Sequence, residues 1–300
     1  MKYKSGYVSL VGKANAGKST LINALIGEKV AIVSPKPQTT RNNILGILTK
    51  QNYQIVFVDT PGIHTSKNAL DRYMAKNVRS AIGGSDIVVY LLDGSKKLLD
   101  DEIKYISNLC EKDCSVIIAI TKIDILNYEK VYPMLSVLSA IVGVKEIIPI
   151  SSFQKRNLDV LEDAILKLLP ESEEKNFIYE EDEYTDKSLK FLVAEIVREK
   201  ALYLYDKEIP HGIALDVVKY EESANTTHID IDIICERDTH KSIIIGNKGL
   251  KIKKLGELSR KDMENLLSRK VMLKLFVKVE ANWRDRPNNL TEFGYNDKLD

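Results

Sequence analysis

Short apolar runs alternate with helix-like patterns over the first half of the chain. The runs occupy residues 7–11, 44–49, 54–59, 86–93, 115–121 and 146–150. Strands that alternate with helices in this way indicate an α/β domain with a mostly parallel sheet. Only a few polar residues separate the runs at 44–49 and 54–59, too few for a crossover helix, so these two strands should pair antiparallel.

The pattern changes in the last third of the chain. Apolar residues recur at helical spacing over 189–197, and they alternate with polar residues over 229–233 and 271–279. Alternation at every second position is typical of strands with one buried face and one solvent-facing face. We therefore expect a helix, two strands, two short helices and a final strand, which together make a small α+β domain.

Residues 171–186 separate the two patterns and are strongly acidic. They include eight Asp or Glu residues and one lysine, with few side chains of the kind that a core buries. This composition is typical of a linker. We expect a first domain over residues 1–170, an acidic linker over 171–186, a second domain over 187–285 and a tail over 286–300.

Composition adds few constraints. With 300 residues, 44% apolar and 29% charged, the chain is an ordinary globular protein of about two domains. Its formal net charge of +1 excludes any argument from overall charge. No apolar run approaches the roughly 20 residues of a membrane span, and the first residues lack the apolar segment of a signal peptide. We expect a cytoplasmic protein, and peripheral contact with a membrane stays open.

Cysteine and histidine residues offer no obvious chemistry. Cys110, Cys114 and Cys235 have no His or second Cys pair nearby, so reduced structural cysteines are favoured over a metal site. The four histidines are scattered, and each is expected to be a surface or turn residue rather than a catalyst.

A phosphate-binding loop follows the first apolar run. Residues 12–19 read Gly-Lys-Ala-Asn-Ala-Gly-Lys-Ser, which is a full GxxxxGK(S/T) motif before a helical stretch. Backbone N–H groups of such a loop cradle the phosphates, while Lys18 reaches the β and γ oxygens and Ser19 ligates Mg²⁺. The motif predicts a nucleoside triphosphate site formed by Gly12, Asn15, Ala16, Gly17, Lys18, Ser19 and Thr20.

Residues that would read the base follow two later strands. Residues 121–124 read Thr-Lys-Ile-Asp, at the sheet edge where ligands of open parallel sheets bind. The Asp124 carboxylate can accept hydrogen bonds from the ring N–H and the amine of guanine, with Lys122 over the base plane. A chance Lys-x-Asp is the alternative for this motif alone. Ser151, Ser152 and Phe153 are placed to meet the base oxygen through backbone amides, which is a weak pattern alone.

A second phosphate-facing motif, Asp-Thr-Pro-Gly, closes the strand at 54–59. Asp59 would hold Mg²⁺ through a water, and the Gly62 N–H would sense the γ-phosphate and couple hydrolysis to movement of the residues that follow. Alone, the Pro-Gly pair would be a plain turn.

The last domain carries a GxxG loop between apolar segments. Gly246 and Gly249 lack Cβ atoms and let a nucleic-acid backbone approach closely. Residues 241–278 hold eleven basic and three acidic residues, so we expect single-stranded RNA here rather than a merely solvated face. Residues 243–245 line the base groove or fill the core, and we expect at least one in the core. The predicted RNA contacts are Ile245, Gly246, Asn247, Lys248, Gly249, Lys251 and Lys254.

These motifs resemble those of the translation-factor class of P-loop GTPases, and specifically the Era family. The resemblance rests on residues 38–41, 59–64, 67–70, 72–74 and 282–285, which span nearly the whole chain. It implies a GTPase domain followed by a type II KH domain, with GTP, GDP and Mg²⁺ as ligands. It also implies a monomer that acts in maturation of the small ribosomal subunit through the 3′ end of its RNA, with peripheral association at the inner face of the membrane.

The resemblance also implies roles for single residues. Lys18, Thr40 and Gly62 would act in hydrolysis, and Thr40 would bring the switch I hydroxyl to Mg²⁺, with its neighbour Thr39 as the alternative. Thr121 departs from the usual asparagine, so a hydroxyl must make the bond that ties this loop to the phosphate loop. Position 63 is Ile63 where Ras-like proteins carry a water-orienting glutamine, so the water must be positioned in another way.

Some alternatives stay open. Asn15 could ligate a potassium ion that bridges the phosphates, as in related GTPases, or could be a polar loop residue that satisfies a backbone group. For the whole chain, the alternatives are a membrane signalling GTPase whose basic domain binds anionic lipid, and a phosphotransferase, against which the guanine-reading Asp124 argues.

Overall fold

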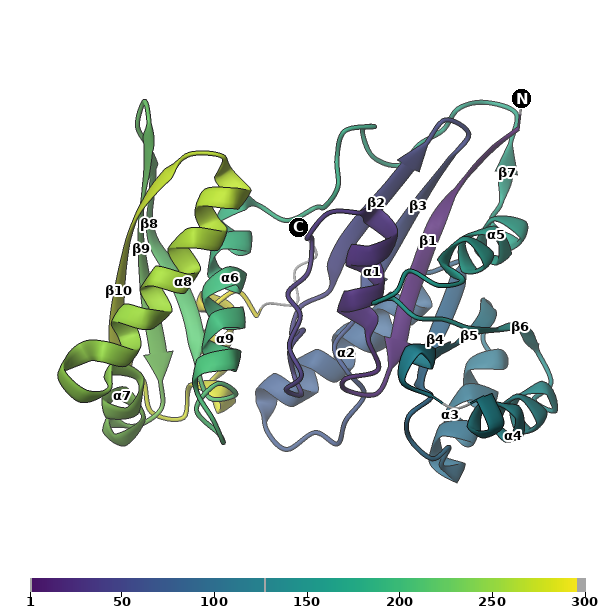
Figure 1. Ribbon diagram of the computed structural model, residues 1–300, viewed down its shortest axis with the longest axis horizontal. Helices are drawn as coiled ribbons and strands as arrows, with labels where there is room; N and C mark the ends of the chain where they lie inside the picture. Colours follow the sequence, from purple (N-terminus) through teal and green to yellow (C-terminus); the bar gives the residue numbers. More distant parts are fainter. Residues whose placement is uncertain (1, 127, 296–300) are drawn as a thin grey trace. The chain divides into compact units, whose positions relative to one another are not determined.

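The computed structural model describes residues 2–126 and 128–295. The chain divides into two compact units, the first made of Met1–Thr65 and Met74–Asp186 and the second of Ser66–Tyr73 and Lys187–Asp300. Each unit has its own sheet, and Figure 1 shows the helices that pack against it.

The first unit is built on a seven-stranded sheet with the order β2-β3-β1-β4-β5-β6 and a short β7 beside β1. The pairs β1–β3, β1–β4, β4–β5 and β5–β6 are parallel, whereas β2 and β3 pair antiparallel. The predicted mostly parallel α/β domain with an antiparallel pair is therefore confirmed. The two-residue strand β7, antiparallel to β1, was not predicted. Up to residue 172 the elements are β1 (Tyr3–Gly12), α1 (Lys18–Ile26), β2 (Ile44–Lys50), β3 (Tyr53–Asp59), α2 (Ala69–Gly83), β4 (Ile87–Asp93), α3 (Asp100–Cys110), β5 (Ser115–Thr121), η1 (Ile123–Ile125), α4 (Tyr128–Ser139), β6 (Val144–Pro149), α5 (Leu158–Leu168) and β7 (Glu171–Ser172).

The central strands explain where the motifs gather. All seven residues of β4 are buried, and because side chains alternate between faces, both faces of the sheet are covered at this strand. The parallel strands β1, β3, β4 and β5 end at Gly12, Asp59, Asp93 and Thr121. Carboxyl ends of parallel strands share one edge, so the phosphate loop, the Asp-Thr-Pro-Gly motif and the Thr-Lys-Ile-Asp motif meet there.

The acidic segment at 171–186, predicted as a linker, lies along the first unit. Its backbone covers the free edge of β2, where Ile47 donates its N–H to the Tyr184 carbonyl at 2.9 Å and Leu45 donates to Asp186 Oδ1 at 3.0 Å. Hydrogen bonds to strands more than a hundred residues away, which composition does not reveal, fix this segment.

Gln54 on β3 is the main anchor of this segment. The side chain is fully buried, its Oε1 accepts the N–H groups of Ile178 and Tyr179 at 2.8 and 2.9 Å, and its Nε2 donates to Thr49 Oγ1 and the Tyr179 carbonyl, both at 2.9 Å. One glutamine therefore satisfies four polar groups.

Gln54→Ala should destabilise the protein by about 2–3 kcal/mol, because two part-buried N–H groups lose their acceptor. Urea unfolding at neutral pH measures this change as a shift of the midpoint. Thr49→Ala is the matched control, since it removes one of the four bonds and should cost about 1 kcal/mol. Equal midpoints for Gln54→Ala and the native chain would show that the segment contributes nothing to stability.

The second unit has a three-stranded sheet of order β10-β9-β8, in which β10 and β9 are parallel and β8 and β9 antiparallel. Helices α6 and α8 pack on this sheet, as Figure 1 shows. Alternate residues of β9, Ile229, Ile231 and Ile233, point into the core beneath these helices. The predicted small α+β domain is confirmed. Its elements are α6 (Leu189–Leu204), β8 (Ala214–Glu222), β9 (Thr226–Cys235), α7 (Asp238–Ile245), η2 (Asn247–Gly249), α8 (Leu250–Leu267), β10 (Lys270–Val279), η3 (Trp283–Asp285) and α9 (Pro287–Glu292).

Residues after 285, predicted as a tail, are in part folded. Trp283 is fully buried and donates its indole N–H to the Gly212 carbonyl at 3.0 Å. The rings of Phe293 and Tyr295 lie against it, with centroids 5.8 and 5.9 Å away. This aromatic cluster extends the second unit to Tyr295.

Candidate functional site

The phosphate loop lies between β1 and α1, as its motif predicts. Gly17 precedes α1 with a left-handed φ of 96°, a conformation that glycine adopts without strain. The first turn of α1 has no acidic side chain, and Ser19 and Thr20 lie on it. The N–H groups and dipole of this helix end are therefore available to an anion.

Lys18 is buried inside the loop. Its Nζ donates to the carbonyls of Gly12 and Lys13 at 3.2 and 3.3 Å. Burial lowers the pKa of Lys18 to about 8, against the opposing attraction of Asp59. A bound triphosphate supplies negative charge and must restore the protonated form.

Nucleotide binding should therefore take up a proton near pH 8. Free Lys18 is half protonated at its pKa of about 8, so binding there should take up about half a proton, and almost none at pH 6.5. Above pH 8 affinity should fall, by up to about tenfold per pH unit. Calorimetry in two buffers of different ionisation heat measures the uptake. Equal heats in both buffers at pH 8 would contradict the assignment.

Three hard oxygen donors meet beside Lys18. Ser19 Oγ donates to Asp59 Oδ2 at 2.6 Å, and Thr40 Oγ1 lies 2.9 Å from Ser19 Oγ and 3.1 Å from the same carboxylate oxygen. Thr39, the alternative to Thr40, instead donates to the Lys36 carbonyl at 2.7 Å. Two hydroxyls and a carboxylate are ligands that suit Mg²⁺, so this donor set fits the predicted metal.

The Asp-Thr-Pro-Gly motif packs directly on the phosphate loop. A Cβ atom on Gly62 would lie 2.8 Å from Ala14 Cα and 2.9 Å from Ala14 N, so only glycine allows this approach. The next residue, Ile63, donates its N–H to the Gly12 carbonyl at 3.0 Å, and its side chain packs against the buried cluster of β1, β4 and β5. Ile63 therefore cannot orient a water.

The loop after β5 is tied to the phosphate loop as the sequence suggests. Thr121 Oγ1 donates to the Ala16 carbonyl at 2.8 Å, which is the hydroxyl bond expected in place of an asparagine amide. Lys122 has a left-handed φ of 63°, and its Nζ contacts Asp93 Oδ2 at 2.7 Å. Burial alone would raise the pKa of Asp93, but hydrogen bonds from Lys122 and Ser95 hold it below its usual value.

Asp124 is held by the loop that follows β6. Ser151 Oγ donates to Asp124 Oδ1 at 2.6 Å, which fixes the carboxylate that would read guanine. Ser152 and Phe153 follow in the same turn, and Phe153 is 86% exposed. The structure thus brings both base-reading motifs together.

The Asn15 side chain contacts the loop that precedes Thr40. Its Nδ2 donates to the Pro35 carbonyl at 2.7 Å, so in this structure its amide satisfies a backbone group, one of the two roles expected. Its Oδ1 is the atom that a potassium ion would use.

The GxxG loop separates α7 from α8. Gly246 ends α7 with φ 73° and ψ 178°, a combination that only glycine adopts readily. Gly249 precedes α8 with φ 77° and has open space where a Cβ would lie. Ile245 is half-buried, whereas Asn247, Lys248, Lys251 and Lys254 are exposed. The predicted loop residues therefore lie together at one helix start.

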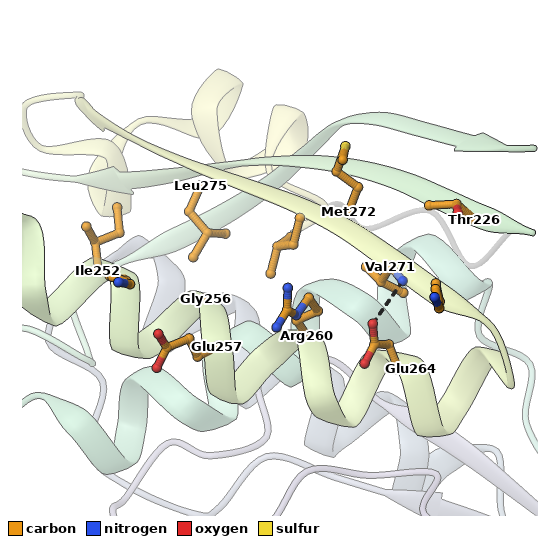
Figure 2. A pocket seen from close by; sticks show the side chains of 12 residues that line it. Thr226, Ile252, Gly256, Glu257, Arg260, Glu264, Val271, Met272 and Leu275 are labelled. Atoms are coloured by element: carbon orange, nitrogen blue, oxygen red, sulfur yellow. Dashed lines mark hydrogen bonds between the residues drawn. The ribbon is translucent and has the colours of Figure 1, made fainter.

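A groove of about 590 Å³ runs between α8 and β10. Figure 2 shows Ile252, Arg260 and Glu264 of α8 on one side and Met272 and Leu275 of β10 on the other. Its lining combines apolar side chains with three basic residues and the acidic Glu257 and Glu264. Apolar surface beside basic side chains suits bases with a phosphate backbone.

One prediction about this surface is confirmed and another needs adjustment. Ile244 is fully buried in the core, as expected for at least one residue of 243–245, whereas Ile243 is 43% exposed. Two cations of the basic stretch, Arg269 and Lys278, pair with Glu222 and Asp232 at 3.0 and 2.5 Å. The free positive charge is therefore smaller than the count suggests.

Comparisons with known proteins decide the family. A family described as 50S ribosome-binding GTPase matches residues 7–122, and a KH domain family matches residues 208–284. GTPase Era of Clostridium botulinum, strain Eklund 17B, is 46% identical over 99% of this chain and 100% of that protein. The chain belongs to the Era family of GTPases. Its reaction is therefore the hydrolysis of GTP to GDP and phosphate.

Solved Era structures extend the similarity to the fold. A variant of Aquifex aeolicus Era bound to GDP·AlF4⁻ has a TM-score of 0.92 and 38% identity, covering 97% of this chain and 99% of that one. Era in complex with MgGDPNP and nucleotides 1506–1542 of 16S ribosomal RNA has a TM-score of 0.92 and 39% identity, with 98% and 99% covered.

The motifs did not identify every residue of interest in this Era-family chain. Arg260, Lys270 and Met272 line the groove but match no motif, because the pairing of α8 with β10 brings them together. The alternation of apolar and polar residues over 271–279 predicts the strand, but it does not indicate which helix packs opposite that strand. Within the described ranges, no helix is long and apolar enough to cross a bilayer, and no group of three His, Cys, Asp or Glu side chains could hold a metal ion.

Proposed function

We propose that this Era-family GTPase binds the 3′ end of the small-subunit ribosomal RNA along the GxxG loop and the α8–β10 groove, and uses GTP as a switch during subunit assembly. The observation that carries the proposal is this groove, because one of its walls is α8, the helix that begins directly after Gly249 of the GxxG loop. The relative bound to MgGDPNP and 16S RNA nucleotides 1506–1542 supports the target.

The nucleotide site has the parts that a switch requires. Lys18 and the α1 end would hold the phosphates, Ser19, Thr40 and a water on Asp59 would hold Mg²⁺, and Asp124 would read guanine. Gly62 lies against the phosphate loop, so its N–H would meet the third phosphate and report its loss to the residues that follow.

A competition assay can distinguish RNA from anionic lipid as the partner of the basic surface. A labelled RNA of the small-subunit 3′ end should bind at least roughly tenfold more tightly than a scrambled RNA of equal length at physiological salt. Phosphatidylglycerol vesicles should not displace it. Equal affinity for both RNAs, or displacement by vesicles, would favour the peripheral membrane role instead.

Hydrolysis should depend on potassium if Asn15 Oδ1 ligates that ion beside the phosphates. Replacing K⁺ with Na⁺ should lower the turnover rate, and Asn15→Ala should erase the difference. Asn15→Asp retains a ligand oxygen and is the matched control. Steady-state phosphate release in the two salts measures the effect, and equal native rates in both would refute the potassium site while leaving GTP hydrolysis in place.

A further inference from the structure

Position 63, where other GTPases carry a water-orienting glutamine, holds an apolar residue in this chain. Ile63 is apolar and packs, partly buried, against the core of the first unit, so it offers a water no hydrogen-bonding group. The next side chain, His64, is polar and part-buried, and its ring contacts the backbone of the Asp-Thr-Pro-Gly motif. Each of its ring nitrogens can donate or accept a hydrogen bond, depending on the tautomer.

A pair of contacts made by the His64 ring agrees on one tautomer. Nδ1 lies 2.7 Å from the Gly62 carbonyl oxygen, which only accepts, so Nδ1 carries the hydrogen. Nε2 faces the side-chain nitrogen of Gln38 at 3.5 Å, a long contact in which the amide can only donate. Nε2 of the neutral ring is therefore an acceptor, directed toward Gln38.

Gln38 holds an unusual backbone conformation for this contact. Its φ is 57°, in the left-handed region that costs a residue other than glycine about 1 kcal/mol or more. Two residues later, Thr40 contacts the Mg²⁺ ligands Ser19 and Asp59. The strained residue thus contacts His64 two positions before the threonine of the predicted metal site.

We propose that His64 Nε2 exchanges its long contact with the Gln38 amide for a hydrogen bond from the water that attacks the γ-phosphate, with Gln38 as a positioning residue that holds the ring until the nucleotide binds. This inference rests on the proposed function of the same site. The His64 ring contacts the Gly62 carbonyl and faces Gln38, two residues before Thr40. Gly62 and Thr40 are the two residues that would flank the third phosphate.

The reaction balances without a base. The water oxygen forms a bond to the γ-phosphorus as the bond from phosphorus to the β,γ-bridging oxygen breaks. GDP leaves with that electron pair, and the protons of the water end on inorganic phosphate or in solvent. His64 orients the water and neither gains nor loses a proton overall.

Two isosteres separate this role from a structural one. His64→Gln places an acceptor at the reach of Nε2, whereas His64→Asn can keep only the donor to Gly62. In single-turnover assays His64→Gln should stay within about tenfold of the native rate, and His64→Asn should fall by roughly 100-fold. Gln38→Ala should lose less, and adding it to His64→Asn should cause no further loss, because Gln38 acts through His64.

Binding measurements complete the test. In His64→Asn the affinity for GDPNP should be unchanged, while the affinity for GDP·AlF4⁻ should fall with the rate, since only the second imitates the transition state. Equal losses in His64→Gln and His64→Asn, a native rate in His64→Asn, or a matching loss of GDPNP affinity would overturn the proposal. Absence of GTP hydrolysis by the native chain would instead overturn the proposed function.

Discussion

Asp124→Asn should convert the nucleotide preference from GTP to XTP. The carboxylate accepts two hydrogen bonds from guanine, and an asparagine presents a donor where one acceptor is needed. Charge-assisted hydrogen bonds contribute roughly 1.5 to 3 kcal/mol each. We expect GTP affinity to fall by roughly 100-fold or more and XTP, whose base has a carbonyl in place of the amine, to gain affinity.

Competition between GTP and XTP for the purified variant measures the preference. Ser151→Ala is the matched control, because it removes the 2.6 Å bond that holds Asp124 but leaves the carboxylate in place. This control should weaken GTP binding about tenfold without favouring XTP. An unchanged preference for GTP over XTP in Asp124→Asn would show that Asp124 does not read the base.

RNA binding and GTP binding should be lost independently. Gly249→Asp places a negative charge where the RNA backbone would lie, and RNA affinity should fall at least roughly tenfold. GTP binding should remain. Lys18→Ala should do the reverse, since it removes the contact to the β and γ phosphates and leaves the second unit intact.

The control for charge is Gly249→Asn. Gly249 has a φ of 77° and open space at its Cβ position, and asparagine and aspartate both tolerate that conformation. Gly249→Asn should therefore retain more RNA affinity than Gly249→Asp at equal folding, checked by circular dichroism. If Gly249→Asp stays folded and binds the RNA like the native chain, the loop does not hold RNA.

The nucleotide site was predictable because its motifs depend on local backbone geometry. The loop before Lys18 needs a strand, glycines and a helix start, and these follow one another in the sequence. Even the substitution at Thr121 was interpretable, since a hydroxyl at a strand end can make the single bond that it makes to Ala16. The choice between Thr39 and Thr40 needed the structure, because adjacent hydroxyls differ only in direction.

Other features could not be predicted from the sequence. The segment at 171–186 has the composition of a linker, yet buried Gln54 and the open edge of β2 hold it on the first unit. His64 was expected to be a surface or turn residue, and only its contacts with Gly62 and Gln38 indicate a role. Each of these features depends on partners that are distant in sequence, and a local sequence pattern does not reveal such partners.

We propose above that the second unit of this GTPase holds the 3′ end of the small-subunit ribosomal RNA. Crosslinking of the full chain to RNA in cells, followed by sequencing of the bound fragments, tests it most directly. We predict reads concentrated at the 3′ end of 16S RNA, lost in Gly249→Asp and retained in Asp124→Asn when XTP is supplied to permeabilised cells. Reads spread evenly over ribosomal RNA, or unchanged in Gly249→Asp, would contradict the account.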